Sequence, residues 1–196
     1  MATPLAAEGP EPPKPDLSPG ESVEVEVRAD LNADGMADLA YIAVKEDSRE
    51  LRVVTTYRDQ FAIGENVPEV LKLDPYPLGD AELSVKRNVL VFGELTGGTT
   101  AVASTQKFHW DPKLGAMRLI GLDATLYSRT LAHDGAEASW NLLTGDLVTR
   151  QLKLNKGAGD AAYTRIAEKK TKKPSPPIRL EKSPDGGDLL GWPGAK

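Results

Sequence analysis

The feature that most constrains this chain is the acidic segment DLNADGMAD at residues 30–38. Oxygen-bearing side chains stand at its first, third, fifth and ninth positions, and Gly35 follows the fifth. Calcium takes about six to eight oxygen ligands, and a calcium loop supplies them at this spacing, with a backbone carbonyl at the seventh position. The candidate ligands are the side chains of Asp30, Asn32, Asp34 and Asp38 and the carbonyl of Met36. We expect Gly35 to make the sharp turn, which glycine does at least steric cost.

The residues around this segment distinguish it from an EF-hand. An EF-hand needs a bidentate glutamate at the twelfth position, where this chain has Tyr41. Apolar residues alternate with charged ones over 22–28, and an apolar run follows over 38–45. The pattern therefore predicts strand, loop, strand rather than helix, loop, helix. The alternative is an acidic hairpin turn without metal, because Asn, Asp and Gly dominate turns.

The run Asp-Leu-Asn-x-Asp-Gly-x-x-Asp-Leu before an apolar strand resembles the calcium loop of FG-GAP-type (VCBS-like) repeats of secreted and periplasmic proteins. The resemblance covers about residues 22–45, in one copy. A looser patch, comprising 108–110, 118–123 and 139–145, is similar to the C-terminal half of small bacterial envelope proteins with such loops. In size, calcium loop and compartment the chain also resembles lysozyme-inhibitor-like immunity proteins. This resemblance implies Ca²⁺ as cofactor and a peptidoglycan hydrolase as protein partner.

Length and composition limit the classes of protein to which the chain can belong. A chain of 196 residues is expected to form one domain with tails. The formal net charge of −5 disfavours a nucleic-acid binder, and the absence of cysteine excludes disulfides and thiol catalysis. The first residues lack the basic and apolar regions of a signal peptide. We expect a periplasmic or cell-surface protein whose leader is missing here, with a membrane anchor through that leader as an open alternative.

The distribution of proline and charge predicts three regions. Residues 1–21 contain six prolines and are expected to be a disordered spacer, while 22–167 form the calcium-binding domain. Residues 168–196 are expected to be a basic, proline-rich tail. Its basic part, 165–182, holds seven basic and two acidic residues and is interpreted as a solvated tail in preference to a nucleic-acid contact.

Alternating apolar residues and regular turn signals predict an all-β, antiparallel domain, either a sandwich or propeller-like sheets. Segment 59–81 is expected to be irregular, with one helical turn near 67–71. Segment 161–167 is either a last strand or a short helix. The other expected strands cover 22–28, 38–45, 51–57, 83–86, 89–95, 100–110, 117–127, 136–142 and 146–154.

No sequence motif for catalysis emerges, so we expect a binding protein rather than an enzyme. His109 and His133 have no triad or metal pattern around them, and Trp140 is expected in the core. Loop tips carry binding residues on rigid scaffolds, so the candidate partner surface lies at 96–100 and 127–135. Its residues are Thr96, Gly97, Gly98, Thr99, Thr100, Tyr127 and His133. The alternatives are a carbohydrate-binding or adhesion module, with an exposed aromatic platform beside the calcium loop, and a hydrolase.

Overall fold

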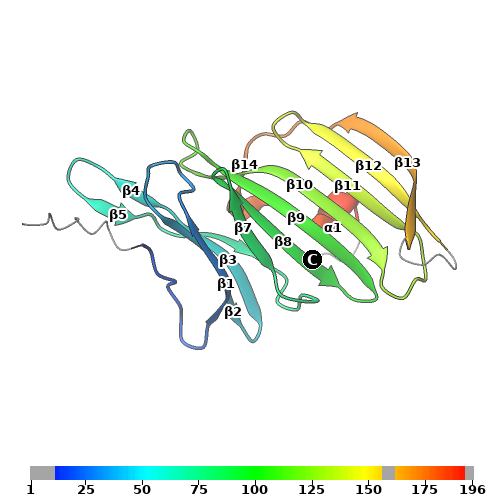
Figure 1. The fold of residues 1–196 in the computed structure, drawn as a ribbon, viewed down its shortest axis with the longest axis horizontal. Helices are drawn as coiled ribbons and strands as arrows, with labels where there is room; N and C mark the ends of the chain where they lie inside the picture. The colour runs from blue at the N-terminus through cyan, green and yellow to red at the C-terminus, as the bar shows by residue number, and fades with distance from the viewer. Residues whose placement is uncertain (1–11, 156–161, 193–196) are drawn as a thin grey trace, which may run out of the picture.

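A computed structural model describes residues 12–155 and 162–192. Two antiparallel sheets dominate the fold, as predicted, and form an all-β sandwich (Figure 1). The small sheet has the order β1-β2-β3-β6. Its strands are β1 (Ser22–Ala29), β2 (Asp38–Lys45), β3 (Ser48–Val54) and β6 (Glu69–Lys72).

The large sheet has the order β13-β12-β11-β10-β9-β8-β7, and β14 pairs with β10. Its strands are β7 (Glu82–Lys86), β8 (Val89–Gly97), β9 (Thr100–Asp111), β10 (Ala116–Ser128), β11 (Gly135–Asn141), β12 (Asp146–Leu154), β13 (Tyr163–Lys172) and β14 (Ile178–Arg179). A separate two-stranded hairpin consists of β4 (Thr56–Arg58) and β5 (Ile63–Glu65).

The strands predicted from alternation are confirmed with closely agreeing ends, except for 51–57. That prediction is wrong in its bounds, because β3 begins at Ser48 and ends at Val54, and Thr56 already belongs to β4 of the separate hairpin. Segment 59–81 differs, because it contains β5 and β6, and the expected helical turn near 67–71 is the strand β6. Segment 161–167 was predicted to be a strand or a short helix, and from Tyr163 onward it is the start of the strand β13. Residue 161 lies outside the described residues. Strands of three or four residues show too few alternations to be separated from a turn by sequence pattern.

The main core lies between the two sheets. The small sheet contributes Ile42, Leu51 and Val53, and the large sheet contributes Phe92 and Phe108, all at most 1% exposed. Trp140 belongs to this core, as predicted, and its Nε1 donates to the carbonyl of Lys173 at 2.9 Å. The Lys173 ammonium also lies 4.4 Å from the centre of the Trp140 ring, so both the core and the chain beyond β13 hold this side chain.

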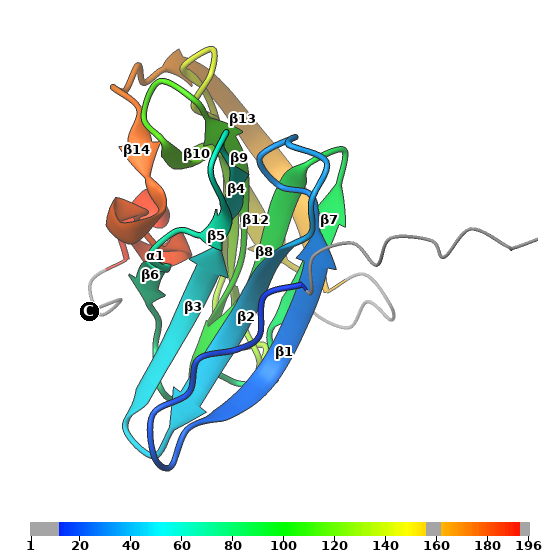
Figure 2. The ribbon, with the colours of Figure 1, turned by 90° about the vertical axis from the view of Figure 1, so that its left-hand side faces the viewer.

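The spacer predicted over 1–21 falls partly on residues outside the described range, and its described part packs on the domain. β2 is buried on both faces, and Tyr41 on its outer face is fully buried. The Tyr41 hydroxyl donates to the carbonyl of Asp16 and accepts from its backbone N–H. Pro13 is buried, and Arg52 forms an ion pair with Glu21 at 2.6 Å. The domain therefore includes residues 12–21, which cover the outer face of the small sheet (Figure 2).

The tail predicted over 168–196 is likewise part of the fold as far as residue 192. After β13 and β14 come a short helical turn, η1 (Leu180–Lys182), and the helix α1 (Gly186–Leu190). Leu180 is fully buried in the core. A Cβ atom on Gly186 would lie 2.6 Å from that of Ser104, so glycine lets α1 approach the large sheet closely. No helix among the described residues has the length and apolar character needed to cross a membrane.

Candidate metal loop and the hairpin beside it

The segment 30–38 joins β1 to β2, as predicted, and turns sharply twice. Gly35 has a φ of 83°, which confirms the glycine turn, and Ala33 has a φ of 64°. Leu31 points into the main core with 1% exposure and anchors the loop to the sandwich. Leu31 therefore attaches the loop to the main core, Met36 is also buried, and the side chains of Asp30, Asn32 and Asp34 lie outside the core.

Three of the predicted ligands accept hydrogen bonds from successive backbone amides of the loop, those of Asp34, Gly35 and Met36. The N–H of Asp34 donates to Oδ1 of Asp30 at 3.2 Å and to Oδ1 of Asn32 at 3.0 Å. The N–H of Gly35 donates to Oδ2 of Asp30 at 3.0 Å, and the N–H of Met36 donates to Oδ1 of Asp34 at 2.8 Å. The side-chain oxygens at the first, third and fifth positions therefore face the same turn of the loop.

Asp38, the fourth carboxylate or amide in the motif, points elsewhere. It is fully buried, and its Oδ2 accepts from the N–H groups of Leu31 at 2.7 Å and Asn32 at 3.1 Å. Its Oδ1 accepts from the N–H and the hydroxyl of Thr56 at 2.7 and 2.9 Å. Burial raises the pKa of Asp38 above its ordinary value, and these donors oppose the shift. Asp38 therefore ties the start of the loop to the start of β4.

These contacts decide how well the loop fits a calcium ion. The loop brings the side-chain oxygens of Asp30, Asn32 and Asp34 together. Such oxygens are the hard ligands that Ca²⁺ prefers. Asp38 is engaged by four protein donors, and in residues 12–155 and 162–192 no three His, Cys, Asp or Glu side chains are arranged to hold a metal ion. The calcium site thus stays a prediction, with an aspartate, an asparagine and a second aspartate as its assembled part.

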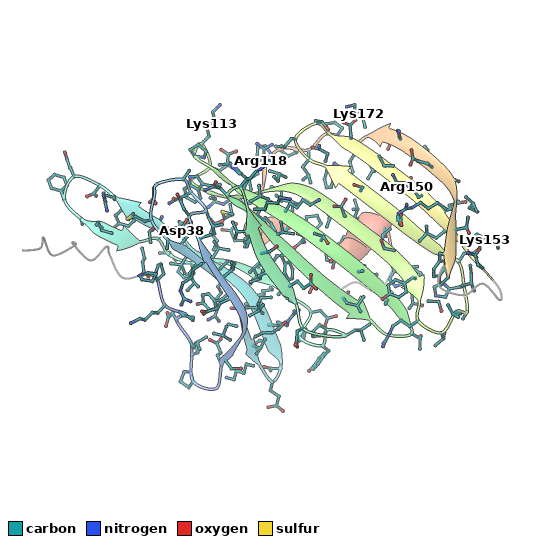
Figure 3. The ribbon with its side chains drawn as sticks, viewed as in Figure 1. Asp38, Lys113, Arg118, Arg150, Lys153 and Lys172 are labelled. Carbon is teal, nitrogen blue, oxygen red and sulfur yellow. The ribbon has the colours of Figure 1, made fainter. Side chains whose placement is uncertain are left out.

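The β4–β5 hairpin contacts this loop directly. In addition to the Asp38 contacts, Nδ2 of Asn32 donates to the carbonyl of Thr56 at 2.7 Å. Figure 3 shows Asp38 at this junction, at the opposite end of the molecule from Arg150 and Lys172. Between loop and hairpin lies a hollow of about 200 Å³, whose wall includes Met36 and Ile63. The base of the hairpin is therefore hydrogen-bonded to the candidate metal loop through Thr56 of β4, and Ile63 of β5 faces the same hollow.

The hairpin projects from the sandwich (Figure 1), and it exposes apolar side chains. Phe61 at its tip is 86% exposed, and Val67 after β5 is 88% exposed. Oδ1 of Asp59 accepts from the N–H groups of Phe61 and Ala62 at 2.7 and 2.8 Å, which caps the turn. The two strands of the hairpin pack closely where the side chain of Tyr57 lies over Gly64. A Cβ atom at Gly64 would lie 2.7 Å from the tyrosine hydroxyl, so only glycine leaves room for this contact. The tip is thus ordered by local contacts while its apolar surface faces outward.

The partner surface predicted from loop tips is brought together at another place. Thr100 and His133 meet through Oγ1 and Nε2 at 2.8 Å, and Tyr127 pairs with Ala101 across β9 and β10. The N–H of Arg129 donates to the carbonyl of Thr99 at 2.8 Å, which joins the two loop tips. The residues Thr96, Gly97 and Gly98 complete the β8–β9 turn. This surface belongs to the large sheet, whereas the β4–β5 hairpin adjoins the small one (Figure 1).

The two histidines have different surroundings. Nδ1 of His133 lies 2.6 Å from the carbonyl oxygen of Asp134, and the Tyr163 hydroxyl donates to the carbonyl of His133. His109 is exposed on β9. One ring nitrogen of His133 contacts the Thr100 hydroxyl, and the other contacts a backbone carbonyl. These contacts are typical of a residue that joins two loops.

Sequence reasoning missed the β4–β5 hairpin and the structural role of Asp38. The exposed aromatic residue Phe61 within a polar stretch was the available signal for the hairpin. For Asp38, the partner residue Thr56 is 18 positions away, so no local spacing indicates the contact. Comparison of the chain with protein-family models, with curated proteins and with solved structures gives no match.

Proposed function

We propose that this chain is a binding protein that presents the β4–β5 hairpin to a protein partner, with loop 30–38 as its calcium-dependent support. The observation that carries the proposal is the link between the two: Asp38 and Asn32 hold Thr56 at the base of the hairpin, and Phe61 is 86% exposed at its tip. A rigid scaffold that positions a loop is the common arrangement for binding surfaces.

The apolar tip supports binding to a protein. Aromatic side chains dominate the energetics of protein interfaces because they bury a large area with few rotatable bonds. Phe61 sits in a turn already capped by Asp59, so little conformational entropy is lost when a partner covers it. Ile63 and Tyr57, 47% and 40% exposed, extend the apolar surface along the hairpin. A partner with a cleft that accepts a two-stranded hairpin fits this shape.

Calcium would act on this hairpin through the loop. Asp30, Asn32 and Asp34 would hold the ion with the Met36 carbonyl, and the ion would supply positive charge between two carboxylates that otherwise repel each other. Because Asn32 also donates to Thr56, a loop fixed by calcium also fixes the base of β4. Asp38 contributes by orienting the loop through its amide contacts.

The narrower proposal for the partner is a peptidoglycan hydrolase of the lysozyme class, met in the periplasm or at the cell surface. Its support is the resemblance of the sequence to envelope immunity proteins with such calcium loops. Under this proposal the hairpin enters the substrate cleft of the hydrolase and excludes the glycan strand, without any reaction catalysed by the chain itself.

The test is inhibition of muramidase activity on peptidoglycan by the full chain in calcium, with a matched pair of variants. Phe61→Asp places a charge at the hairpin tip, and Leu143→Asp places one at the β11–β12 turn, where leucine is 60% exposed. We expect inhibition by the native chain and by Leu143→Asp, and loss of inhibition with Phe61→Asp. Absence of inhibition across muramidases excludes the hydrolase partner, and equal inhibition by both variants excludes the hairpin as the binding element.

A further inference from the structure

A cavity of about 490 Å³ lies on the core-facing side of the large sheet, away from loop 30–38. Its walls come from three parts of the chain: the end of β6 and the segment after it, the strands β8 and β9, and the C-terminal segment around Ser183 and Gly186. Figure 2 shows β6 and α1 on the same side of the molecule. The C-terminal segment is held in place by the burial of Leu180, so the cavity is a fixed feature of the fold.

The inward row of the large sheet changes from apolar to polar where it reaches this cavity. Phe92 on β8 is followed at the next inward position by Glu94, which pairs with Ser104 on β9. Phe108 on β9 is preceded at the previous inward position by Gln106. Inward positions of a sandwich ordinarily carry apolar residues, because a buried polar group costs free energy unless it is hydrogen-bonded.

Three carboxylates line the cavity: Asp74, Glu94 and Asp185. The Glu94 side chain is 7% exposed and forms an ion pair with the buried Arg49 at 3.0 Å, but Arg49 also pairs with Glu24 at 2.7 Å. One guanidinium therefore serves two carboxylates. Burial raises the pKa of Glu94, and the charges of Asp185 and Asp74 raise it further. Lys72 also lines the cavity, so the three carboxylates face one lysine and the guanidinium that Arg49 shares with Glu24, and negative charge stays in excess.

Gln106 adds an unpaired acceptor in the same wall. Its side chain lines the cavity, and the residue is 3% exposed. Nε2 donates to the carbonyl of Pro184 at 2.6 Å and to Oγ of Ser183 at 3.1 Å, which fixes the orientation of the amide. The opposite atom, Oε1, is buried without a hydrogen-bond partner among the described residues. A buried carbonyl oxygen without a donor costs free energy, and a ligand donor that reaches it would recover that cost.

The spacing of these groups selects the kind of cation. Within residues 12–155 and 162–192 no three acidic or histidine side chains are grouped to hold a metal ion, so these carboxylates do not form the compact ligand set of a bare metal cation. The rest of the wall combines hydroxyls, such as that of Ser104, with the apolar surfaces of Leu71 and Pro75 and with Tyr76, which is 69% exposed. A planar cation with several N–H donors can meet separated carboxylates and a carbonyl while stacking on such a wall.

We propose that this cavity binds a guanidinium group, with Asp74, Glu94 and Asp185 as its anionic partners and Oε1 of Gln106 as a neutral acceptor. The guanidinium belongs to a small free ligand or to an arginine side chain of a protein. Both sources share the recognition chemistry. The proposal does not depend on the hairpin or on calcium.

The test is calorimetric titration of the full chain with three probes. Agmatine represents a free guanidinium, arginine blocked at both ends represents a protein side chain, and blocked citrulline is the uncharged isostere of the second. We expect agmatine or blocked arginine to bind and citrulline to give no heat, and the tighter of the two identifies the source. Equal binding of citrulline and arginine, or no heat from any probe at millimolar concentration, overturns the proposal.

A matched pair of variants locates the binding. Asp185→Asn removes one charge from the cavity wall and keeps a good N-cap for α1, because asparagine caps helices as well as aspartate does. Asp146→Asn removes one charge at the distant β11–β12 turn. We expect Asp185→Asn to weaken guanidinium binding by about tenfold and Asp146→Asn to leave it unchanged. If Asp185→Asn fails to fold, Asp74→Asn replaces it, since an asparagine oxygen can still accept from the N–H of Tyr76.

A further readout separates ligand binding from a structural role for Gln106. The side-chain amide resonance of Gln106 should shift on titration with the probe that binds, because its Oε1 gains a donor. Binding without any change at this resonance would exclude Gln106 from the site and overturn the assignment.

Discussion

Oδ1 of Asp38 accepts two hydrogen bonds from one residue, the backbone N–H and the hydroxyl of Thr56, at 2.7 and 2.9 Å. The two residues are 18 positions apart and belong to different elements, β2 and β4. Because Oδ2 of the same carboxylate holds the amides of Leu31 and Asn32, one buried side chain sets the position of the acidic loop relative to the projecting hairpin.

Thr56→Val should destabilise the protein by about 1 kcal/mol, because valine keeps the shape of threonine but removes the hydroxyl donor to Asp38. For a chain of this size that change lowers Tm by about 2–4 °C. Thermal unfolding followed by circular dichroism measures it. Thr105→Val, on β9 of the large sheet, is the control and should have a smaller effect. Equal Tm values for the native chain and Thr56→Val would show that the hydroxyl contributes nothing.

Asp38→Asn should cost more, about 2–4 kcal/mol, because the amide nitrogen would face donors and leave buried N–H groups without acceptors. Denaturant unfolding measures the free energy directly. Both variants are measured in EGTA, so that loss of a proposed calcium ligand has no effect, and Asp34→Asn is the matched control, because Asp34 is exposed and an asparagine oxygen can still accept from the N–H of Met36. A loss no larger than that of the control would contradict the role assigned to Asp38.

Removal of calcium with EGTA should lower Tm if loop 30–38 binds the ion. A ligand at about 100–1,000 times its dissociation constant stabilises the native state by about 2.7–4.1 kcal/mol. Asp34→Ala should abolish the difference between calcium and EGTA, whereas Asp146→Ala should retain it. Absence of both a calcium-binding heat and a thermal shift in the native chain would identify the loop as an acidic turn.

Glu69 makes stability depend on pH. Burial, with the nearby negative charge of Glu181, raises the pKa of Glu69 from 4.5 to about 7, and its Oε2 has no hydrogen-bond partner among the described residues. The folded state therefore binds a proton that the unfolded state has lost, so this contribution to stability is complete below pH 4.5 and disappears as the pH rises through about 7.

Glu69→Gln should remove this dependence. The variant keeps an oxygen that can accept from the N–H of Met117 but carries no charge. We expect its Tm to exceed that of the native chain by about 2–4 °C above pH 8, for a gain of about 1 kcal/mol, and to match it near pH 4.5. Glu82→Gln, at an exposed position of β7, is the control. A native Tm that rises between pH 4.5 and 7 while that of Glu69→Gln stays level would contradict the assignment.

The sequence was sufficient to predict most strands and the position of the acidic loop between β1 and β2. The alternation of Val25 and Val27 and the turn residues after each strand are local signals, and the sheets follow them. Val23 is an exception, because a β-bulge between Val23 and Val25 places its side chain against the outer cluster of the small sheet. The glycine turn at Gly35 was predicted for the same reason, because its left-handed φ is a local requirement.

Contacts between distant segments were beyond that reasoning. Lysine and proline dominate the composition of the C-terminal segment, so the sequence predicted a solvated tail. The buried side chain of Leu180 nevertheless attaches this segment to the core. The sequence predicted that the N-terminal segment is a disordered spacer, but the hydroxyl of Tyr41 holds Asp16 on the outer face of β2. In each case the segment meets a surface that exists only after folding, so composition gives no indication of the contact.

Amide hydrogen exchange of residues 55–66, compared in calcium and in EGTA, tests the central claim most directly, because it reports on the hairpin while the change is made at loop 30–38. We predict slower exchange of the hairpin amides in calcium, and no difference between the two conditions in Asp34→Ala. Equal exchange rates of this segment in the native chain, with and without calcium, would contradict the proposal that the loop supports the hairpin.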